Sequence, residues 1–287
     1  MGTYKTEKNL NGVQLEIAKI YEANGKYAEA SKVYLGVFSV ASGRPVKGAP
    51  PPVAYSFDEM MFARLQYGAM MDKIGMAPKV TQHWKDGVLF YEAQKKAGAT
   101  GEVATEAYAQ MLFALAEPEY GTYMALRVNG PGDKKLPQKQ VDKMLLEQLK
   151  LKVKAFSALE ATYNKIIGSG AGKWGTASLV RLGLASEDLA ATLLNSYVPT
   201  YLTEDQKEIY RMVLEDKAYP ATQKAATFYS AALAKAYELS LYDESTAEAT
   251  RRLGVLAPDE FPGLFETIPA PRFSAPSAKT ASFEKEP

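Results

Sequence analysis

The sequence predicts an all-α protein, an α-solenoid built from stacked antiparallel helical hairpins. Strong helix formers such as Ala, Leu, Glu, Lys and Met are plentiful, whereas alternating runs of β-branched residues are nearly absent. Apolar residues recur at three- and four-residue steps over long segments, which is the spacing of one helix face. Short segments rich in Pro and Gly, at residues 42–52 and 129–133, interrupt this pattern because a helix cannot continue through them.

The composition argues against several classes of function. Of the 287 residues, 47% are hydrophobic, which is enough to form a core. The 34 basic and 33 acidic residues balance, whereas proteins that bind nucleic acid or anionic membranes usually carry a basic excess. No apolar run approaches the roughly 18–20 residues that cross a bilayer. With no cysteine and a single histidine, His83, the chain offers little for a metal site or a Ser-His-Asp triad. We therefore expect no metal, no cofactor, no bound nucleic acid and no membrane insertion, whereas carboxylate chemistry stays possible; the absence of catalytic residues is implied only by the family resemblance described below.

Residues 12–37 form one complete predicted helix–turn–helix unit. Ala18 and Ala30 have no bulk, so two helices can approach closely at these positions. Gly25 is suited to the turn between them. The space around the contact is filled by aromatic side chains at Tyr21, Tyr27 and Tyr34.

The next segments predict further hairpins. Ser56 and Glu59 form a capping-box signature, which marks the start of a helix. The Ala77-Pro78 pair is expected to be the turn of this second hairpin. Another helix begins near Glu102, and we expect Pro118 to interrupt it.

The strongest break lies at residues 129–133, and we place the main boundary there. It separates an N-terminal helical region, residues 1–128, from a C-terminal helical region, residues 134–256. From residue 257 to residue 287 the chain is rich in proline, which predicts an extended or disordered tail.

A long helix is predicted after the boundary. Seven lysines between Lys134 and Lys154 are interpreted as its solvated face, with a docking surface for an acidic partner as the alternative. The opposite face carries an apolar stripe at three- and four-residue steps, which consists of Leu145, Leu149, Val153, Phe156, Leu159, Tyr163 and Ile166.

The glycine-rich residues 168–174 superficially resemble a phosphate-binding loop. The spacing does not fit, because Ile167 stands where the first glycine is needed and Trp174 stands where Ser or Thr would bind magnesium. A helix rather than a strand precedes the segment, so we interpret it as a turn between helices. Further along, Thr203 and Gln206 form a second capping-box signature, and Pro220 is expected to stop or restart that helix.

The spacing of small and aromatic residues in the unit at 12–37 resembles that of a tetratricopeptide repeat, a 34-residue helical hairpin. The Leu182-Gly183 pair matches the same motif, although Ser186 stands where its tyrosine is usual. Ala234 and Tyr237 match the first helix of a further repeat. This resemblance implies stacked repeats and a protein that binds other proteins, since a single repeat cannot bury its own apolar faces.

The C-terminal part, roughly residues 156–272, resembles a narrower group. Its segments 204–220, 234–242 and 257–262 are similar to tetratricopeptide proteins of predatory and gliding deltaproteobacteria, including gliding-motility proteins of the cell envelope. This resemblance implies an exported, periplasmic or envelope-associated scaffold that binds peptide segments or other subunits. No signal peptide is visible at the N-terminus, so the cytoplasm is the alternative location.

In tetratricopeptide repeats the first helix of each unit lines a concave groove, and the resemblance implies which residues would do so here. We expect a peptide groove with apolar anchors and mixed charges. Its predicted residues are Leu15, Lys19, Glu22, Val180, Leu184, Glu187, Phe228, Lys235 and Glu238.

Two alternatives stay open. The groove can instead be filled by the chain's own tail, whose apolar side chains are Phe261, Leu264, Phe265 and Phe273. The second alternative is an all-α enzyme or carrier that holds a small ligand or a cell-wall glycan between the helical halves. A glycan-cleaving enzyme needs an isolated glutamate in an apolar pocket, and Glu117 is the best candidate. Our first expectation is a non-enzymatic scaffold.

Overall fold

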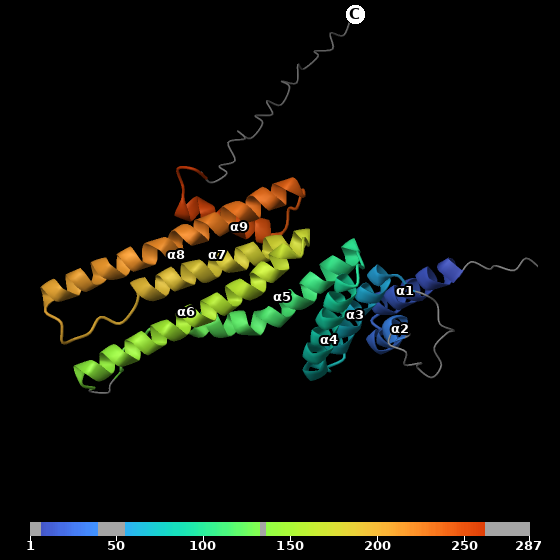
Figure 1. Ribbon diagram of the computed structural model, residues 1–287, viewed down its shortest axis with the longest axis horizontal. Coiled ribbons are helices and arrows are strands. Elements are labelled where there is room, and N and C mark those ends of the chain that lie inside the picture. The colour runs from blue at the N-terminus through green and yellow to red at the C-terminus, as the bar shows by residue number, and fades with distance from the viewer. Residues whose placement is uncertain (1–6, 40–54, 133–135, 262–287) are drawn as a thin grey trace, which may run out of the picture.

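The computed structural model describes residues 7–39, 55–132 and 136–261, and it describes the side chains from residue 12 onward. Within these ranges the fold is all-α, as predicted, with nine helices and no strand (Figure 1). The helices are α1 (Glu7–Ala23), α2 (Tyr27–Ser39), α3 (Phe57–Lys73), α4 (Ala77–Lys96), α5 (Glu102–Ala125), α6 (Gln138–Gly168), α7 (Gly172–Leu194), α8 (Glu204–Glu238) and α9 (Glu244–Leu256).

The first predicted hairpin is confirmed in detail. Helices α1 and α2 pack together, and the turn between them places Gly25 at a φ of 71°, a left-handed conformation that glycine adopts without strain. Ala18 and Ala30 are fully buried at the contact between the helices. Tyr34 is fully buried beside them, and it packs edge-to-face against Phe62 of α3.

The second hairpin also begins where the sequence predicts. Ser56 accepts a hydrogen bond from the backbone N–H of Glu59, and the Glu59 carboxylate accepts one from the backbone N–H of Ser56. The turn lies before the expected Ala77-Pro78 pair, between Lys73 and Ala77, and it contains Gly75 at a φ of 79°. Ala77 and Pro78 belong to the first turn of α4, where the missing N–H of proline has no helical partner to lose.

The two predicted proline breaks are wrong. Helix α5 continues through Pro118, and α8 continues through Pro220. Both rings are on exposed positions, while small residues on the opposite faces, such as Ala116 and Ala218, are buried against neighbouring helices. Burial of the helix along its length compensates for the backbone hydrogen bond that each proline removes. Ala234 and Tyr237 consequently lie on the exposed last turns of α8 rather than at the start of another hairpin.

The capping box at the start of α8 is confirmed, with Thr203 and Gln206 exchanging their two hydrogen bonds. The glycine-rich segment at residues 168–174 joins two helices, as predicted. Gly170 has a φ of 88° in the turn, and α7 begins at Gly172.

Helix α7 is the centre of the C-terminal half, because it packs against α5, α6, α8 and α9 (Figure 1). Its closest neighbour is α8, and their approach depends on Gly183. A Cβ atom at this position would lie 2.4 Å from Cε1 of the fully buried Tyr229.

The largest apolar cluster joins residues from α3 to α7, so it continues across the predicted boundary at residues 129–133. Separate clusters lie between α1, α2 and α3, and between α7, α8 and α9. None of the described helices combines the length and apolar character that a transmembrane span requires. The segment at residues 42–52, most of the predicted tail, and with it Leu264, Phe265 and Phe273, lie outside the described residues.

Candidate functional site

The nine predicted groove residues lie on three helices, α1, α7 and α8. Of those on α1, Leu15 is buried in the cluster between α1, α2 and α3, whereas Lys19 is half-exposed. Those on α7 belong to the other half, and Val180 is buried in the cluster with α8 and α9. Of the residues on α8, Phe228 packs against the largest cluster, and Lys235 pairs with Glu238 in an ion pair on the surface.

Two of the predicted groove charges, Glu22 and Glu187, form contacts between helices. Glu22 accepts a hydrogen bond from the hydroxyl of Tyr34 at 3.3 Å and forms an ion pair with Lys73 at 3.4 Å. Glu187 accepts one from the hydroxyl of Tyr229 at 2.6 Å and forms an ion pair with Arg252 at 3.0 Å. In each case the three side chains come from three consecutive helices.

This arrangement, which we name the Tyr–Glu–cation joint, recurs along the chain. The carboxylate comes from one helix, the buried tyrosine from the next, and the cation from the helix after that. The four joints within the described residues are Glu22–Tyr34–Lys73, Glu92–Tyr108–Lys165, Glu117–Tyr163–Arg181 and Glu187–Tyr229–Arg252. Burial raises the pKa of all four tyrosines, so each hydroxyl keeps its proton and donates a hydrogen bond to the carboxylate.

Glu117 therefore differs from the isolated acid that the enzyme alternative requires. Both of its carboxylate oxygens accept hydrogen bonds from the guanidinium of Arg181, at 3.0 and 2.9 Å. Tyr163 donates a third hydrogen bond to it. His83 is half-buried, and its Nε2 lies 2.8 Å from the carbonyl oxygen of Arg64. Burial lowers the pKa of His83, as expected for a packing residue.

Val180 and Leu184 line a cleft of about 700 Å³ between α7 and α9, together with Trp174. Two of its basic side chains already have anionic partners. Arg181 is held in the joint with Glu117, and Arg251 forms an ion pair with Glu248 at 2.7 Å. Part of the charge on the lining of this cleft is thus neutralised within the protein.

A second cleft, which we name the α6–α8 cleft, was not predicted from the sequence. It also has a volume of about 700 Å³, and its lining is predominantly apolar. One wall is the N-terminal half of α6, with Leu145, Leu146, Leu149 and Val153. The other wall is the N-terminal part of α8, with Tyr210, Val213 and Leu214. Leu189 and Leu193 of α7 form the floor, and Pro199, Tyr201 and Leu202 of the α7–α8 connection close one end.

The walls of this cleft leave large apolar side chains in contact with solvent. Leu146 is 51% exposed, Val153 is 45% exposed and Val213 is 48% exposed. Large apolar side chains gathered around a concave surface are typical of sites that bind another molecule, whereas single exposed ones are common everywhere. At the left of Figure 1 the N-terminal halves of α6 and α8 lie on either side of the connection that follows α7.

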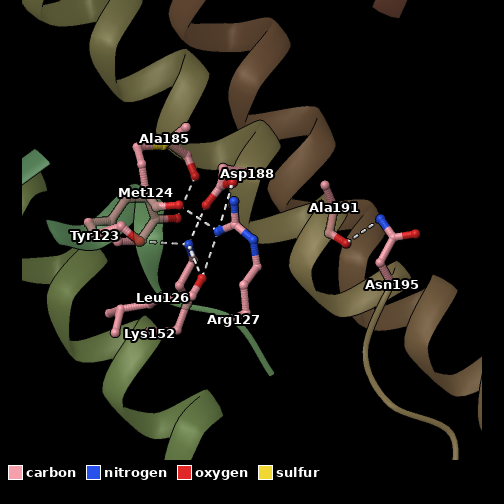
Figure 2. Close-up of polar contacts among 9 residues, drawn as sticks. All are labelled: Tyr123, Met124, Leu126, Arg127, Lys152, Ala185, Asp188, Ala191 and Asn195. Carbon is pink, nitrogen blue, oxygen red and sulfur yellow. Dashed lines mark hydrogen bonds and ion pairs between the residues drawn. The ribbon is translucent and has the colours of Figure 1, made fainter. Parts of the chain in front are cut away.

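A buried polar cluster lies next to the cleft lining in the sequence of α6 (Figure 2). Lys152 precedes Val153 of the cleft wall, and its side chain is fully buried. Its Nζ donates hydrogen bonds to the carbonyl oxygens of Tyr123, at 2.9 Å, and Leu126, at 3.1 Å, and it forms a close ion pair with Asp188. These carbonyls belong to the C-terminal end of α5, where helical partners are missing. Lys152 thus joins α6 to the end of α5 and to α7.

Two further contacts complete this cluster (Figure 2). The hydroxyl of Tyr123 donates a 2.6 Å hydrogen bond to the carbonyl oxygen of Ala185, and Arg127 lies 3.5 Å from Asp188. Burial lowers the pKa of Lys152, while the hydrogen bond with Asp188 opposes this shift. The interpretation of all seven lysines as a solvated face is therefore wrong for Lys152. The signal was in the spacing, because Lys152 follows Leu149 by three positions and precedes Phe156 by four.

Comparison with known proteins identifies no family: no family model matches this chain, and no curated protein matches it. The geometry of the described residues is thus the main guide to function.

Proposed function

We propose that this protein is a non-enzymatic helical scaffold that binds a segment of a partner protein in the α6–α8 cleft. The main support for the proposal is the apolar lining of this cleft, in which Leu146, Val153 and Val213 are exposed to solvent. Binding would remove these side chains from water, which favours association by roughly 25 cal/mol per Å² of apolar surface buried.

The length of the cleft favours a protein segment as the ligand. Its α6 wall runs from Gln138 to Val153, and a helix rises about 1.5 Å per residue, so the wall is about 22 Å long. That is about four helical turns, more than a compact small molecule needs. Helix-in-groove binding uses a row of apolar anchors of this kind.

The polar cluster around Lys152 supports the same proposal. Because Lys152 ties α6 to α5 and α7, the α6 wall is held in place before a partner arrives. A preformed groove loses less conformational entropy on binding than one that must be ordered first.

We further propose, from the resemblance of the C-terminal part to envelope tetratricopeptide proteins, that the partner is a subunit of a bacterial envelope assembly and that this assembly serves motility. The four Tyr–Glu–cation joints are consistent with a scaffold role, because they use buried polar groups to fix the relative position of consecutive helices. In all four the carboxylate accepts a hydrogen bond from the tyrosine and pairs with a cation.

The proposal is tested by site-specific crosslinking. The chain contains no cysteine, so a single introduced cysteine carries a photo-crosslinking label at one defined position. We would label Leu146→Cys in the cleft and Leu89→Cys on α4 as the matched control, since Leu89 is also an exposed leucine in the middle of a helix. We expect a protein adduct in lysate of the producing organism from position 146 and not from position 89.

A second variant excludes a trivial result. Val213→Asp on the opposite wall should remove the adduct from position 146, because a charge would then face the apolar ligand. Equal labelling from both positions, or labelling that survives Val213→Asp, would refute a binding site in the cleft. An adduct with a small lipid or glycan would instead favour the carrier alternative.

A further inference from the structure

Four exposed lysines run along the outer edge of the α6–α8 cleft. Each directly follows a residue that lines the cleft: Lys139 follows Gln138, Lys143 follows Asp142, Lys150 follows Leu149 and Lys154 follows Val153. Successive residues on a helix are rotated by about 100°, so the lysines form a row next to the lining residues. On the other side of the lining residues lie those that precede them in the sequence, among them the buried Val141 before Asp142 and the buried Lys152 before Val153. The surface of α6 therefore passes from core to cleft to lysine row.

This row carries a local excess of positive charge, although the whole chain has a formal net charge of only +1. Among the described residues, the one ion pair of the row joins Lys143 to Glu147 at 3.8 Å, with both side chains largely exposed. The carboxylate inside the cleft, Asp142, already accepts a hydrogen bond from Tyr201. The α8 wall differs, because Lys217 in the cleft is followed along α8 by the buried Ala218 and preceded by the exposed Asp216.

From this charge pattern we infer that the ligand of the α6–α8 cleft is an amphipathic helix of a partner protein with acidic residues along the flank that faces α6. The inference rests on the proposed function and adds the chemistry of the partner. The lysine row, from residue 139 to residue 154, is parallel to the apolar row and about as long, roughly 22 Å. A helix carries acidic side chains along one flank over this length when they are spaced by three or four residues. On the α8 side the basic Arg211 and Lys217 are accompanied by the acidic Glu215 and Asp216, so the row of lysines on α6 fixes which flank of the helix faces α6.

The shape of the site favours a helix over an anionic membrane surface, which would also attract lysines. The floor of the cleft is made by Leu189 and Leu193 of α7, and Leu193 is buried at its base. A flat bilayer surface cannot reach this floor between two helices, whereas the side chains of a docked helix can.

The experiment is a selection from a displayed library of amphipathic helices of about 18 residues, a length that matches the cleft. The apolar face is fixed as Leu and Ala, and the two flanks are randomised among Glu, Lys, Gln and Ser. The full chain is the bait, and clones that also bind the Leu146→Asp variant are removed. We expect enrichment of Glu on one flank and not on the other.

Binding of an enriched peptide is then measured with two charge-reversed variants. The first changes the lysine row to glutamate at positions 139, 143, 150 and 154. The second makes the same change in net charge on the α2 and α4 surfaces, through Lys32→Glu, Lys79→Glu, Lys85→Glu and Lys96→Glu. We expect the first variant to weaken binding by about tenfold or more, as the loss of four modest ion pairs predicts, and the second to change it much less.

The outcomes separate the two proposals. Enrichment of cleft-dependent helices with no flank charge would overturn the acidic partner while the proposed function stands. Failure to enrich any cleft-dependent helix would overturn both. Equal weakening by the two charge-reversed variants would assign the effect to net charge and overturn the role of the lysine row. Binding of phosphatidylglycerol vesicles that requires Leu146 and displaces the peptide would identify the site as a membrane contact instead.

Discussion

Replacement of Lys152 by methionine removes the charge of a fully buried side chain while it keeps the length and most of the apolar contacts. The structure allows the cost to be worked out from the partners that remain. Removal of one partner of a buried ion pair costs about 3–5 kcal/mol of stability, because the other charge is left uncompensated. Here the residual cost is at the lower end, since Asp188 keeps Arg127 at 3.5 Å and the carbonyl of Leu126 keeps a hydrogen bond from Arg127.

We therefore expect Lys152→Met to lower the free energy of unfolding by about 3 kcal/mol. For a domain of this size, each 1 kcal/mol lowers the melting temperature by about 2–4 °C, so the expected decrease is about 6–12 °C. Urea unfolding followed by circular dichroism measures the first quantity, and a thermal scan measures the second. The matched control is Lys150→Met, two positions away and exposed, for which we expect a change within about 0.5 kcal/mol.

A double-mutant cycle with Asp188→Asn separates the ion pair from the packing of the lysine stem. If the pair is the cause, Lys152→Met combined with Asp188→Asn should cost less than the sum of the two single changes. Equal small effects of Lys152→Met and Lys150→Met would refute the reasoning, because they would mean that the buried cation contributes no more than an exposed one.

Three further predictions concern the contacts between helices. Gly183→Ala should lower the free energy of unfolding by about 1–3 kcal/mol, because its Cβ would clash with Tyr229. Gly36→Ala in α2, which has open space around it, should raise the free energy of unfolding by up to about 1 kcal/mol. Urea unfolding that gave both changes the same sign would contradict this. Glu187→Gln should destabilise by about 1–2 kcal/mol, since it removes the charge that binds both Tyr229 and Arg252 and leaves Arg252 with Glu248 as its remaining anion. A thermal scan identical to wild type would show that this joint carries no stability. Burial raises the pKa of Tyr163 and Tyr229 above the ordinary value of 10.0. Above pH 10 the phenols of the unfolded chain release their protons while the buried ones keep them, which favours the unfolded state. The contribution of these tyrosines to the free energy of unfolding is therefore fully present below pH 10 and is lost as the pH rises above it. Urea unfolding between about pH 9 and pH 11 should show falling stability, and a flat profile would contradict this assignment.

The helical hairpins could be predicted because their signals are local. The small residues at Ala18 and Ala30, the glycine at the turn and the two capping boxes all act within a few positions of the chain. The prolines were misjudged because their local cost competes with packing that the sequence does not display. Pro118 and Pro220 sit on exposed faces of helices whose other faces are buried, and this tertiary packing outweighs the lost hydrogen bond.

The candidate site could not be predicted in the same way, because it depends on contacts between distant segments. Val153 fits the apolar stripe of α6 and was assigned to the core, yet it lies on a cleft wall whose other side is formed some sixty residues later in the chain. Glu22 and Glu187 were assigned to a groove from their motif positions. Their tyrosine and cation partners come from other helices, and those partners decide that the two carboxylates form joints.

Three successive residues of α6 have three different surroundings: the core, the cleft and the outer edge of the cleft. Lys152 is buried and joins three helices, Val153 lines the cleft, and Lys154 stands on its outer edge. Two are the same amino acid, and only a rotation of about 100° per residue distinguishes their surroundings. The buried lysine fixes the rotation of α6 about its own axis, because its three hydrogen bonds cannot form in another orientation. The same contact that stabilises the core therefore also sets which side chains face the cleft and which lysines line its edge, so the stability of this region and its capacity to select a ligand have one structural origin.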